Sequence, residues 1–331
     1  MKALSKRRVG VLGAGHYVPD RVLSNLDLEK MVDTSDEWIY TRTGMRERRI
    51  AAPEQATSDL CIEAGRRALA SAGVDPLDIG IVIVATVTPD HCVPATACIV
   101  QAALGCKNAG AFDVEAACSG FVASMNIASA LIANGMCQRA LIIGGETMSR
   151  IVDYSDRTSC ILFGDGAGAA VLGLDAPRGE YLGGQLGADG SGADTMRVFA
   201  SGSRRQMDQQ ALDEGMHLLR MRGNEVFKFA VQTFRTLLEN QLREFEFEPK
   251  DLGLVIPHQV NFRIIESALK KLAIPDDRIF MNLEKYGNTS AASVGIAFSE
   301  AYQQGRLTEG KLVSLIAFGA GLTWSSALLR W

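Results

Sequence analysis

The sequence predicts an α/β fold built from two similar halves. Short apolar runs rich in Val and Ile alternate with amphipathic runs, as expected of sheets whose buried faces are covered by helices. In addition, residues 71–86 (SAGVDPLDIGIVIVAT) resemble residues 244–259 (EFEFEPKDLGLVIPHQ), since both lead from a helix end through a proline-containing turn into a strand. We therefore predict halves of residues 1–177 and 178–331 that pack as one unit.

The apolar and amphipathic runs place the individual elements. Strands are expected at 79–86, 111–114, 140–145, 252–258 and 312–319. Helices are expected at 58–73 and 224–245, where apolar residues recur every three or four positions. Residues 116–138 carry no charge and are numerous enough to suggest a membrane span, but their serines and asparagines do not suit a lipid-facing helix. We expect a helix enclosed by protein, which can satisfy these polar groups.

Composition excludes several classes of protein. The chain has 331 residues, of which 47% are hydrophobic and 22% charged, with a net charge of -4, which argues against a nucleic-acid partner. Its basic and then apolar start is interrupted by His16, Tyr17, Pro19 and Asp20, so it does not fit a signal peptide. Seven cysteines, an odd number without a C-x-x-C pair, favour reduced thiols. We expect a cytoplasmic protein without a membrane partner or a bound metal.

Three residues that can carry chemistry each follow a predicted strand or turn and precede a predicted helix. Cys118 follows the strand at 111–114, and a helix N-terminus there would lower a thiol pKa that is ordinarily about 8.5. His258 ends the strand-like run at 252–258, at the edge of a sheet where α/β proteins usually place their sites. Asn288 follows a turn at Gly287, before a helix that Thr289 or Ser290 can cap.

Each of these residues alone has a plainer interpretation, as a packing cysteine, a core histidine or a turn asparagine. Their coincidence points to chemistry, because three helix N-termini around one cavity would make a positive, water-poor pocket. Such a pocket stabilises a thiolate and then an enolate or oxyanion. The pattern is typical of acyl transfer through a thioester with carbanion chemistry.

Six motifs in order resemble β-ketoacyl-acyl-carrier-protein synthase III, of the thiolase superfamily, over essentially the whole chain. They are DVEAACSGF around Cys118, PHQVNFRI around His258, GNTSAAS around Asn288, DTSDEWIYTRTG at 33–44, FGDGAGAAVL at 163–172 and FGAGLTWSSAL at 318–328. The resemblance implies a thiolase-like five-layered α-β-α-β-α fold and a homodimer. It also implies condensation of an acyl-CoA primer with malonyl-acyl-carrier protein at the start of fatty acid synthesis, with acyl-CoA as a substrate and no cofactor.

The resemblance also implies roles for individual residues. Cys118 would take the acyl group as a thioester, while His258 and Asn288 would stabilise the malonyl enolate. The backbone N–H groups of Cys118 and Ala320 would hold the oxyanion. The CoA tunnel would comprise Thr34, Trp38, Arg42, Arg157, Gly223, Phe227 and Asn261, with the adenine between Trp38 and Arg157. The residues facing the acidic carrier protein would be Lys228, Arg263, Lys270 and Lys271.

Two positions depart from the family pattern. Val93 stands where a Phe, contributed across the dimer, limits the acyl pocket of acetyl-restricted members, so we predict tolerance of longer or branched primers. Ala320 replaces a Gly, which suits backbone donation if its φ is compatible.

The related enzymes differ at identifiable residues. A thiolase needs a second catalytic Cys near its C-terminus, but the last cysteine is Cys160. Elongating synthases pair Cys with two His, whereas this chain has Asn288 in the second place. Hydroxymethylglutaryl-CoA synthase needs a catalytic Glu near its nucleophile; Glu115 is three residues from Cys118, but the Asn288 motif argues against that enzyme. Chalcone-synthase-like enzymes share the three residues but are longer and lack the flanking motifs. A starter-unit ketosynthase or acyltransferase of a secondary-metabolite pathway keeps the same three residues and stays open.

Two interpretations come from other classes of protein. The segment GVLGAG at 10–15 has the wrong spacing for a dinucleotide-binding loop, and HYVPD follows it in place of a helix. A non-catalytic module that only binds a carrier protein would not need the complete set of Cys118, His258 and Asn288.

Overall fold

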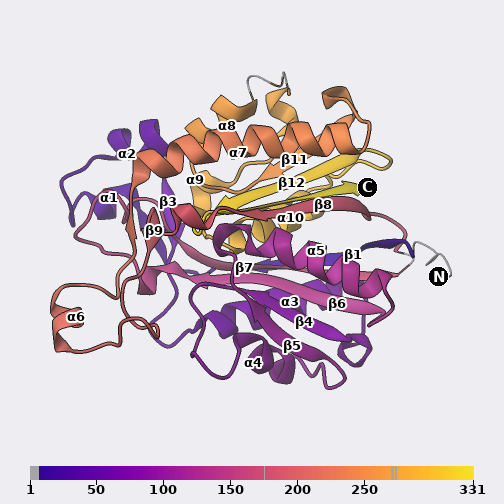
Figure 1. Ribbon diagram of the computed structural model, residues 1–331, viewed down its shortest axis with the longest axis horizontal. Coiled ribbons are helices and arrows are strands. Elements are labelled where there is room, and N and C mark those ends of the chain that lie inside the picture. Colours follow the sequence, from indigo (N-terminus) through magenta and orange to yellow (C-terminus); the bar gives the residue numbers. More distant parts are fainter. Residues whose placement is uncertain (1–6, 175, 270–271, 273) are drawn as a thin grey trace.

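The computed structural model describes residues 7–174, 176–269, 272 and 274–331. Two sheets and three helical layers stack as α-β-α-β-α (Figure 1). Helices α7 (Gly223–Glu244) and α8 (Phe262–Leu269) lie outside one sheet, and α3 (Thr57–Ala72) and α4 (Thr96–Ala103) outside the other. Helices α5 and α10 lie between the sheets. The predicted fold class is confirmed.

The first sheet has the strand order β1-β7-β6-β4-β5. Strand β4 pairs in parallel with β5 and β6, whereas β7 pairs antiparallel with β6 and β1. All five residues of β4 are buried, which explains its unbroken apolar sequence. The strands are β1 (Val9–Tyr17), β4 (Ile81–Ala85), β5 (Gly110–Val114), β6 (Arg139–Thr147) and β7 (Asp165–Leu174).

The second sheet, in the order β11-β12-β13-β8, repeats this arrangement. Its strands β8, β13, β12 and β11 correspond in order and direction to β1, β7, β6 and β4. The predicted boundary between residues 177 and 178 falls in the connection from β7 to β8. The strands are β8 (Glu180–Ala188), β11 (Leu252–Pro257), β12 (Leu312–Gly319) and β13 (Thr323–Arg330).

The charge-free run forms η2 (Ala117–Ser119) and α5 (Gly120–Ala133), and α5 contacts strands of both sheets. Its Asn126 side chain donates to the Ser326 carbonyl at 3.1 Å and accepts from the Tyr181 hydroxyl at 2.9 Å. The hydroxyls of Ser124 and Ser129 are buried without a hydrogen-bond partner in the described part of the chain. A protein-enclosed helix is confirmed, but its polar groups are satisfied only in part.

Helix α10 (Ala292–Gln303) reaches the first sheet through glycine. A Cβ atom at Gly168 of β7 would lie 2.1 Å from the carbonyl carbon of Gly295, so the two backbones are in direct contact. This close approach holds the N-terminus of α10 at a fixed height above the sheet. Gly168 and Gly295 are therefore required for this close packing.

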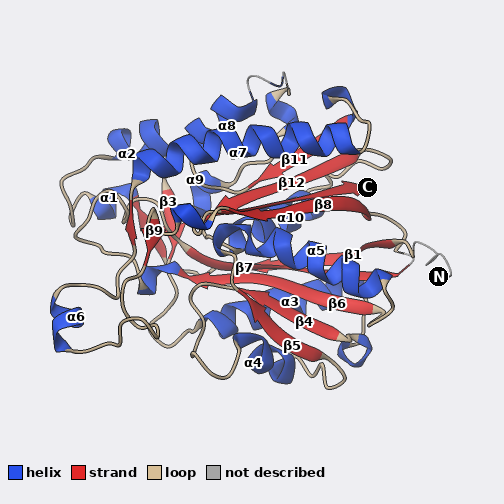
Figure 2. Cartoon of the chain, viewed as in Figure 1, coloured by secondary structure: helices blue, strands red, loops and turns tan. Residues whose placement is uncertain are grey.

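The remaining elements surround this stack (Figure 2). Figure 2 shows α6 on a long loop that extends away from the layers. The other helices are α1 (Asn25–Leu28), α2 (Asp36–Thr43), α6 (Gln209–Asp213) and α9 (Leu283–Tyr286), and the short strands are β2 (Val22–Ser24), β3 (Glu47–Arg49), β9 (Met196–Arg197) and β10 (Arg220–Met221). The 3-10 turns besides η2 are η1 (Pro76–Asp78), η3 (Met148–Arg150), η4 (Gly190–Gly192), η5 (Pro249–Asp251) and η7 (Asp276–Arg278).

Sequence periodicity located the main elements well. The predicted strands at 79–86, 140–145, 252–258 and 312–319 correspond to β4, β6, β11 and β12, and the predicted helices at 58–73 and 224–245 correspond to α3 and α7. All seven cysteines are free thiols. Within the described ranges, no helix has the length and apolar character needed to cross a membrane.

Candidate active site

The three residues singled out by the sequence line one narrow cavity. Cys118 comes from η2 ahead of α5, His258 follows the end of β11, and Asn288 lies in the turn ahead of α10. Their exposed fractions are 6%, 1% and 3%. The layered fold thus brings together, in a nearly dry site, a thiol, an imidazole and an amide from three distant parts of the chain.

Cys118 is a buried, neutral thiol. Burial raises its pKa to about 12, while a contact of 3.6 Å from its Sγ to the Ser290 Oγ acts in the opposite direction. The expectation of a lowered pKa is therefore wrong for the enzyme without substrate. A helix N-terminus typically contributes only about 0.3 to 1 kcal/mol, and here burial outweighs it. Deprotonation of Cys118 needs a proton acceptor.

His258 is held as a neutral imidazole. Its Nδ1 lies 2.6 Å from the Ser293 Oγ, and its ring meets Phe318 edge to face at a centroid distance of 5.6 Å. Burial lowers the His258 pKa to about 3, so the ring is uncharged near neutral pH. With Nδ1 bonded to Ser293, Nε2 is the nitrogen that a substrate can use.

The amide of Asn288 is fixed by backbone contacts. Its Oδ1 accepts the Ser290 N–H at 2.8 Å, its own N–H donates to the Leu162 carbonyl at 2.8 Å, and its carbonyl accepts from Gly164 at 3.0 Å. Because Oδ1 is used in this way, the NH₂ group is the part of the amide that Asn288 can offer to a ligand.

The predicted helix cap is wrong. The N-cap residue of α10 is Ala291, which has no side-chain cap bond, and neither Thr289 nor Ser290 takes that place. The Ser290 hydroxyl instead contacts Cys118 and donates to Glu146 Oε1 at 3.0 Å. The hydroxyl expected to cap the helix therefore belongs to the hydrogen-bond network around Cys118.

Glu146, at the end of β6, was missed by the sequence interpretation. Its carboxyl is fully buried, and it accepts from the Thr88 hydroxyl at 2.6 Å and from Ser290. Burial raises its pKa to about 7 in spite of these hydrogen bonds. The signal that could have identified Glu146 was its position directly after an apolar run. An acidic residue is seldom buried at such a strand end unless it has a function.

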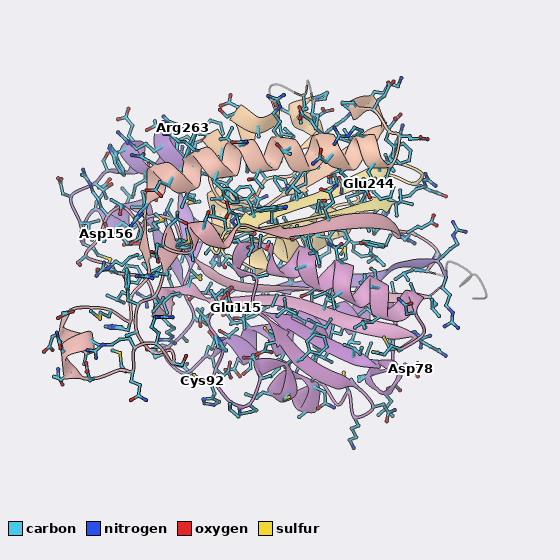
Figure 3. All side chains as sticks on the ribbon, viewed as in Figure 1. Asp78, Cys92, Glu115, Asp156, Glu244 and Arg263 are labelled. Carbon is cyan, nitrogen blue, oxygen red and sulfur yellow. The ribbon has the colours of Figure 1, made fainter. Side chains whose placement is uncertain are left out.

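A second cavity of about 510 Å³ opens beside Cys118. Cys118 and Ala320 line both cavities, and Ala320 does not have a left-handed φ, so alanine is compatible with its backbone. Apolar side chains form much of the wall, and Glu115, near the centre of Figure 3, also lines it. The apolar wall residues include Val87, Met148, Ile151, Phe163, Met196, Val198 and Leu219.

The sequence and structure agree with one family of enzymes. Family models described as 3-oxoacyl-[acyl-carrier-protein] synthase III match residues 112–190, and residues 242–331 for the C-terminal part. A β-ketoacyl-[acyl-carrier-protein] synthase III from Caldanaerobacter subterraneus subsp. tengcongensis is 51% identical over 98% of both chains. The chain belongs to the β-ketoacyl-acyl-carrier-protein synthase III family.

Solved structures of family members have the same fold. The synthase III from Aquifex aeolicus has a TM-score of 0.90 and 42% identity, covering 98% of this chain and 100% of that one. A priming β-ketosynthase of a polyketide pathway has a TM-score of 0.91 and 35% identity, covering 100% of this chain and 98% of that one. The chain is therefore similar in structure both to a synthase III and to a priming ketosynthase of a polyketide pathway.

Most of the residues that the synthase III resemblance assigns to CoA form one cluster. Arg42 and Arg157 have their Cζ atoms 4.4 Å and 5.1 Å from the Trp38 ring centroid, and Arg157 donates to the Asp33 carbonyl at 2.8 Å. Asn261 donates to the Arg42 carbonyl at 3.0 Å. Thr34, in the loop before α2, has a buried hydroxyl that lacks a partner among the described residues.

Gly223, Phe227, Lys228 and Arg263 belong to helices α7 and α8. Gly223 and Phe227 are exposed in the first turns of α7, whose Val226 and Phe229 line the catalytic cavity. Lys228 on α7 and Arg263 on α8 are exposed, and Figure 3 shows Arg263 at the upper left of the molecule. Lys270 and Lys271 lie outside the described residues.

Val93 does not line the 510 Å³ cavity of its own chain. It is 85% exposed, in the loop between β4 and α4. A part in the acyl pocket would therefore require a second copy of the chain. In the ranges that the structure describes, no group of three or more His, Cys, Asp or Glu side chains is arranged so that it could bind a metal ion.

Proposed function

We propose that the protein condenses an acyl-CoA primer with malonyl-acyl-carrier protein, giving β-ketoacyl-acyl-carrier protein, CoA and CO₂ at the start of fatty acid synthesis. The observation that carries this proposal is the meeting of Cys118, His258 and Asn288 in one cavity. A thiol, an uncharged imidazole donor and an amide donor are the groups that acyl transfer followed by enolate formation requires.

The first half of the reaction moves the acyl group from CoA to Cys118. The Cys118 sulfur attacks the thioester carbonyl, a new C–S bond forms, and the CoA thiolate leaves. The backbone N–H groups of Cys118 and Ala320 hold the oxyanion, where a lost donor costs roughly 2.7 to 4 kcal/mol of barrier. The closeness of these segments supports this role, because a Cβ at Gly319 would lie 2.6 Å from the Cys118 nitrogen.

The second half uses His258 and Asn288. The malonyl group loses CO₂, and the electron pair of the broken C–C bond forms an enolate whose oxygen accepts from His258 Nε2–H and the Asn288 amide. The carbanion attacks the acyl carbon, and the Cys118 thiolate leaves. The low His258 pKa supports donation by a neutral ring, because the group need not gain a proton near neutral pH.

We propose that CoA binding moves Arg157. An adenine stacked between Trp38 and Arg157 needs two contacts of about 3.5 Å, or about 7 Å in all. The Arg157 Cζ lies only 5.1 Å from the Trp38 ring centroid. Arg157 would therefore shift outward by about 2 Å on binding, which would strain or release its bond to the Asp33 carbonyl.

We also propose the partners that the family resemblance implies, in a cytoplasmic protein. Exposed Lys228 and Arg263 would contact the acidic carrier protein. Strand β5 is an edge strand with Phe112 38% exposed, and a second copy pairing there would form a homodimer and shield it. In such a dimer, each copy would supply its Val93 side chain to the acyl pocket of its partner.

The second candidate is priming of a secondary-metabolite pathway, as a starter-unit ketosynthase or an acyltransferase. It is favoured by the similarity to the polyketide priming enzyme and by the 510 Å³ cavity beside Cys118. A valine at position 93 in place of a bulky aromatic residue would leave that cavity open to longer or branched primers. Primer preference distinguishes the candidates.

The test is incubation with acetyl-CoA, longer and branched acyl-CoAs and malonyl-acyl-carrier protein, with mass spectrometry of Cys118. We expect acyl-Cys118, and ketoacyl product when the malonyl donor is present. Cys118→Ala should lose acyl transfer, whereas His258→Ala and Asn288→Ala should form the acyl-enzyme but lose decarboxylation. Acylation at another residue, or none, would overturn the proposal.

The primer prediction has its own measurement. Wild-type protein should accept primers longer than acetyl, and Val93→Phe should narrow the panel towards acetyl. A strict acetyl preference that Val93→Phe leaves unchanged would contradict the role of Val93.

A further inference from the structure

A buried chain of hydrogen-bonding groups leads from Cys118 through Ser290, which also lines the 510 Å³ cavity, to Glu146. The Cys118 Sγ lies 3.6 Å from the Ser290 Oγ, which in turn donates to Glu146 Oε1 at 3.0 Å. The exposed fractions of the three residues are 6%, 2% and 0%. The nucleophile is therefore connected to a carboxyl group through one hydroxyl, without contact with bulk water.

The surroundings of Glu146 suit a carboxylate. The N–H groups of Val87 and Ala291 lie 3.1 to 3.4 Å from its oxygens, and the hydroxyls of Thr86, Thr88 and Ser290 donate to it as well. Two of these groups, Ser290 and Ala291, immediately precede α10, where the helix dipole favours negative charge. Glu146 can therefore be charged despite its complete burial, because its oxygens accept hydrogen bonds from several donors.

The backbone at both ends of the Cys118 contact adopts an unusual conformation. Ala117 has a φ of 46° and Ser290 a φ of 48°, in the left-handed region that non-glycine residues seldom enter. Such conformations cost about 1 to 3 kcal/mol and persist where the surrounding structure requires them. Here they turn Cys118 and Ser290 towards each other.

We propose that Glu146 is a positioning residue that accepts the Cys118 proton through Ser290 when the acyl group is taken from CoA. The inference rests on the proposed function. Glu146 Oε1 takes the Ser290 hydroxyl proton while Ser290 Oγ takes the thiol proton. The freed S–H electron pair forms the bond to the acyl carbon.

The proton balance closes over the full reaction. The CoA thiolate leaves with the electron pair of its C–S bond and takes a proton from water. After condensation the Cys118 thiolate leaves the acyl carbon and recovers its proton from Glu146 through Ser290. One proton is consumed from solvent for each CO₂ released from the malonyl carboxylate.

His258 is the other base in the site, but it is a poor proton acceptor. Its pKa is lowered to about 3 by burial, whereas the Glu146 pKa is raised to about 7. Glu146 therefore binds a proton far more readily than His258. His258 therefore stays neutral and can donate to the enolate, while Glu146 accepts the thiol proton.

Electrostatic coupling favours transfer over separate ionisation. Burial is the main cause of the raised pKa values of the two neighbouring thiols, Cys118 in η2 and Cys61 on α3. The charged Glu146 raises both pKa values further, and Asp90, Asp113 and Asp59 act on Cys61 in the same direction. A thiolate beside a protonated Glu146 avoids that repulsion. Because the Glu146 pKa is about 7, the charged form that can accept a proton increases as the pH rises through 7.

The test measures acylation of Cys118 in a single turnover with acyl-CoA alone, from pH 5.5 to 9, by intact-protein mass spectrometry. The variants are Glu146→Gln, Ser290→Ala and Ser290→Gly. Glycine relieves the left-handed backbone and alanine does not, so an equal loss in both assigns the effect to the hydroxyl. Ser124→Ala is the matched control, because it removes a buried hydroxyl that has no described partner.

We expect wild-type acylation to rise around pH 7 and level off. The Glu146 and Ser290 variants should acylate roughly 100-fold more slowly at pH 7, the contribution typical of general base catalysis. Their rates should keep rising to pH 9, because only direct ionisation of the thiol remains. Decarboxylation of the malonyl thioester by Glu146→Gln should stay within about threefold of wild type, since His258 and Asn288 are unchanged.

Two results would overturn the inference. One is a Glu146→Gln profile that matches wild type, and the other is an equal loss of acylation and decarboxylation, which would indicate a structural role. The rate of Cys118 alkylation by iodoacetamide over the same pH range measures the reactivity of the thiol without any substrate. If wild-type Cys118 takes no acyl group, the proposed function fails, and the alkylation profile still decides whether Glu146 controls the thiol.

Discussion

Ser293→Ala should slow decarboxylation while leaving the acyl-enzyme step intact. The Ser293 Oγ lies 2.6 Å from His258 Nδ1, inside the protein. His258 Nε2 can donate to an enolate only in the tautomer whose Nδ1 is an acceptor, and the Ser293 hydroxyl is the donor that selects this tautomer. Alanine removes that selection.

The size of the effect follows from the buried hydrogen bond. Losing one partner of a buried pair costs about 1 to 3 kcal/mol. If the whole cost falls on the transition state, at 1.36 kcal/mol for each factor of ten, the decarboxylation rate falls roughly 5- to 150-fold. Among the described residues, Ser293 bonds to His258 and makes no hydrogen bond to Cys118, so acylation of Cys118 by acyl-CoA should change by less than about twofold.

The assay follows CO₂ release from malonyl-acyl-carrier protein and, separately, acylation of Cys118. Ser299→Ala is the matched control, because Ser299 lies on the same helix and makes an equivalent contact of 3.0 Å with His16 Nδ1, outside the catalytic cavity. A normal decarboxylation rate in Ser293→Ala would refute the tautomer argument. A comparable loss in Ser299→Ala would show that the effect is one of helix stability.

Three further predictions concern stability and CoA. The His258 pKa is about 3 in the folded state against 6.5 in an unfolded chain. The stability that neutral His258 adds above pH 6.5 should therefore be lost as the pH falls towards 3. In urea unfolding across this range, the free energy of unfolding of His258→Asn should decline less steeply than that of the wild type. Gly295→Ala should lower the free energy of unfolding by about 1 to 3 kcal/mol through overpacking, whereas Gly202→Ala, where a Cβ meets open space, should change it little; an equal melting temperature for the two variants would contradict the close helix contact. Trp38→Ala should raise the KM for acyl-CoA without raising it for acyl-pantetheine, and a parallel rise for both would exclude adenine stacking on Trp38.

The sequence predicted the elements and the three reactive side chains because both are encoded locally. An apolar run such as 312–319 predicts a buried strand. A polar residue directly after such a run therefore lies at the end of the strand. Cys118 and His258 each come after a strand, where the sites of α/β proteins usually gather, whereas Asn288 comes after α9 and was singled out by its turn before a helix. Local pattern was therefore sufficient to single out these three side chains.

The same reasoning failed where the answer depends on depth and on contacts between distant segments. The Cys118 pKa is set mainly by its burial in the layered fold, and a local sequence pattern does not predict the depth of burial. Ser290 precedes a helix and so has the pattern of a cap, yet its hydroxyl faces a carboxyl group 144 residues away in the chain. Glu146 became visible only when β6, η2 and the start of α10 were seen side by side.

The matching left-handed residues at Ala117 and Ser290 bear on the ancestry of the enzyme. Each precedes one of the two central helices, α5 and α10, at corresponding places in the repeated halves. A duplicated ancestor would have presented two identical turns facing each other, with the same side chain available twice. In this chain the copies have diverged, since one carries the thiol and the other carries the amide and the hydroxyl. The two halves therefore hold different reactive groups at corresponding turns, and neither half alone carries all of them.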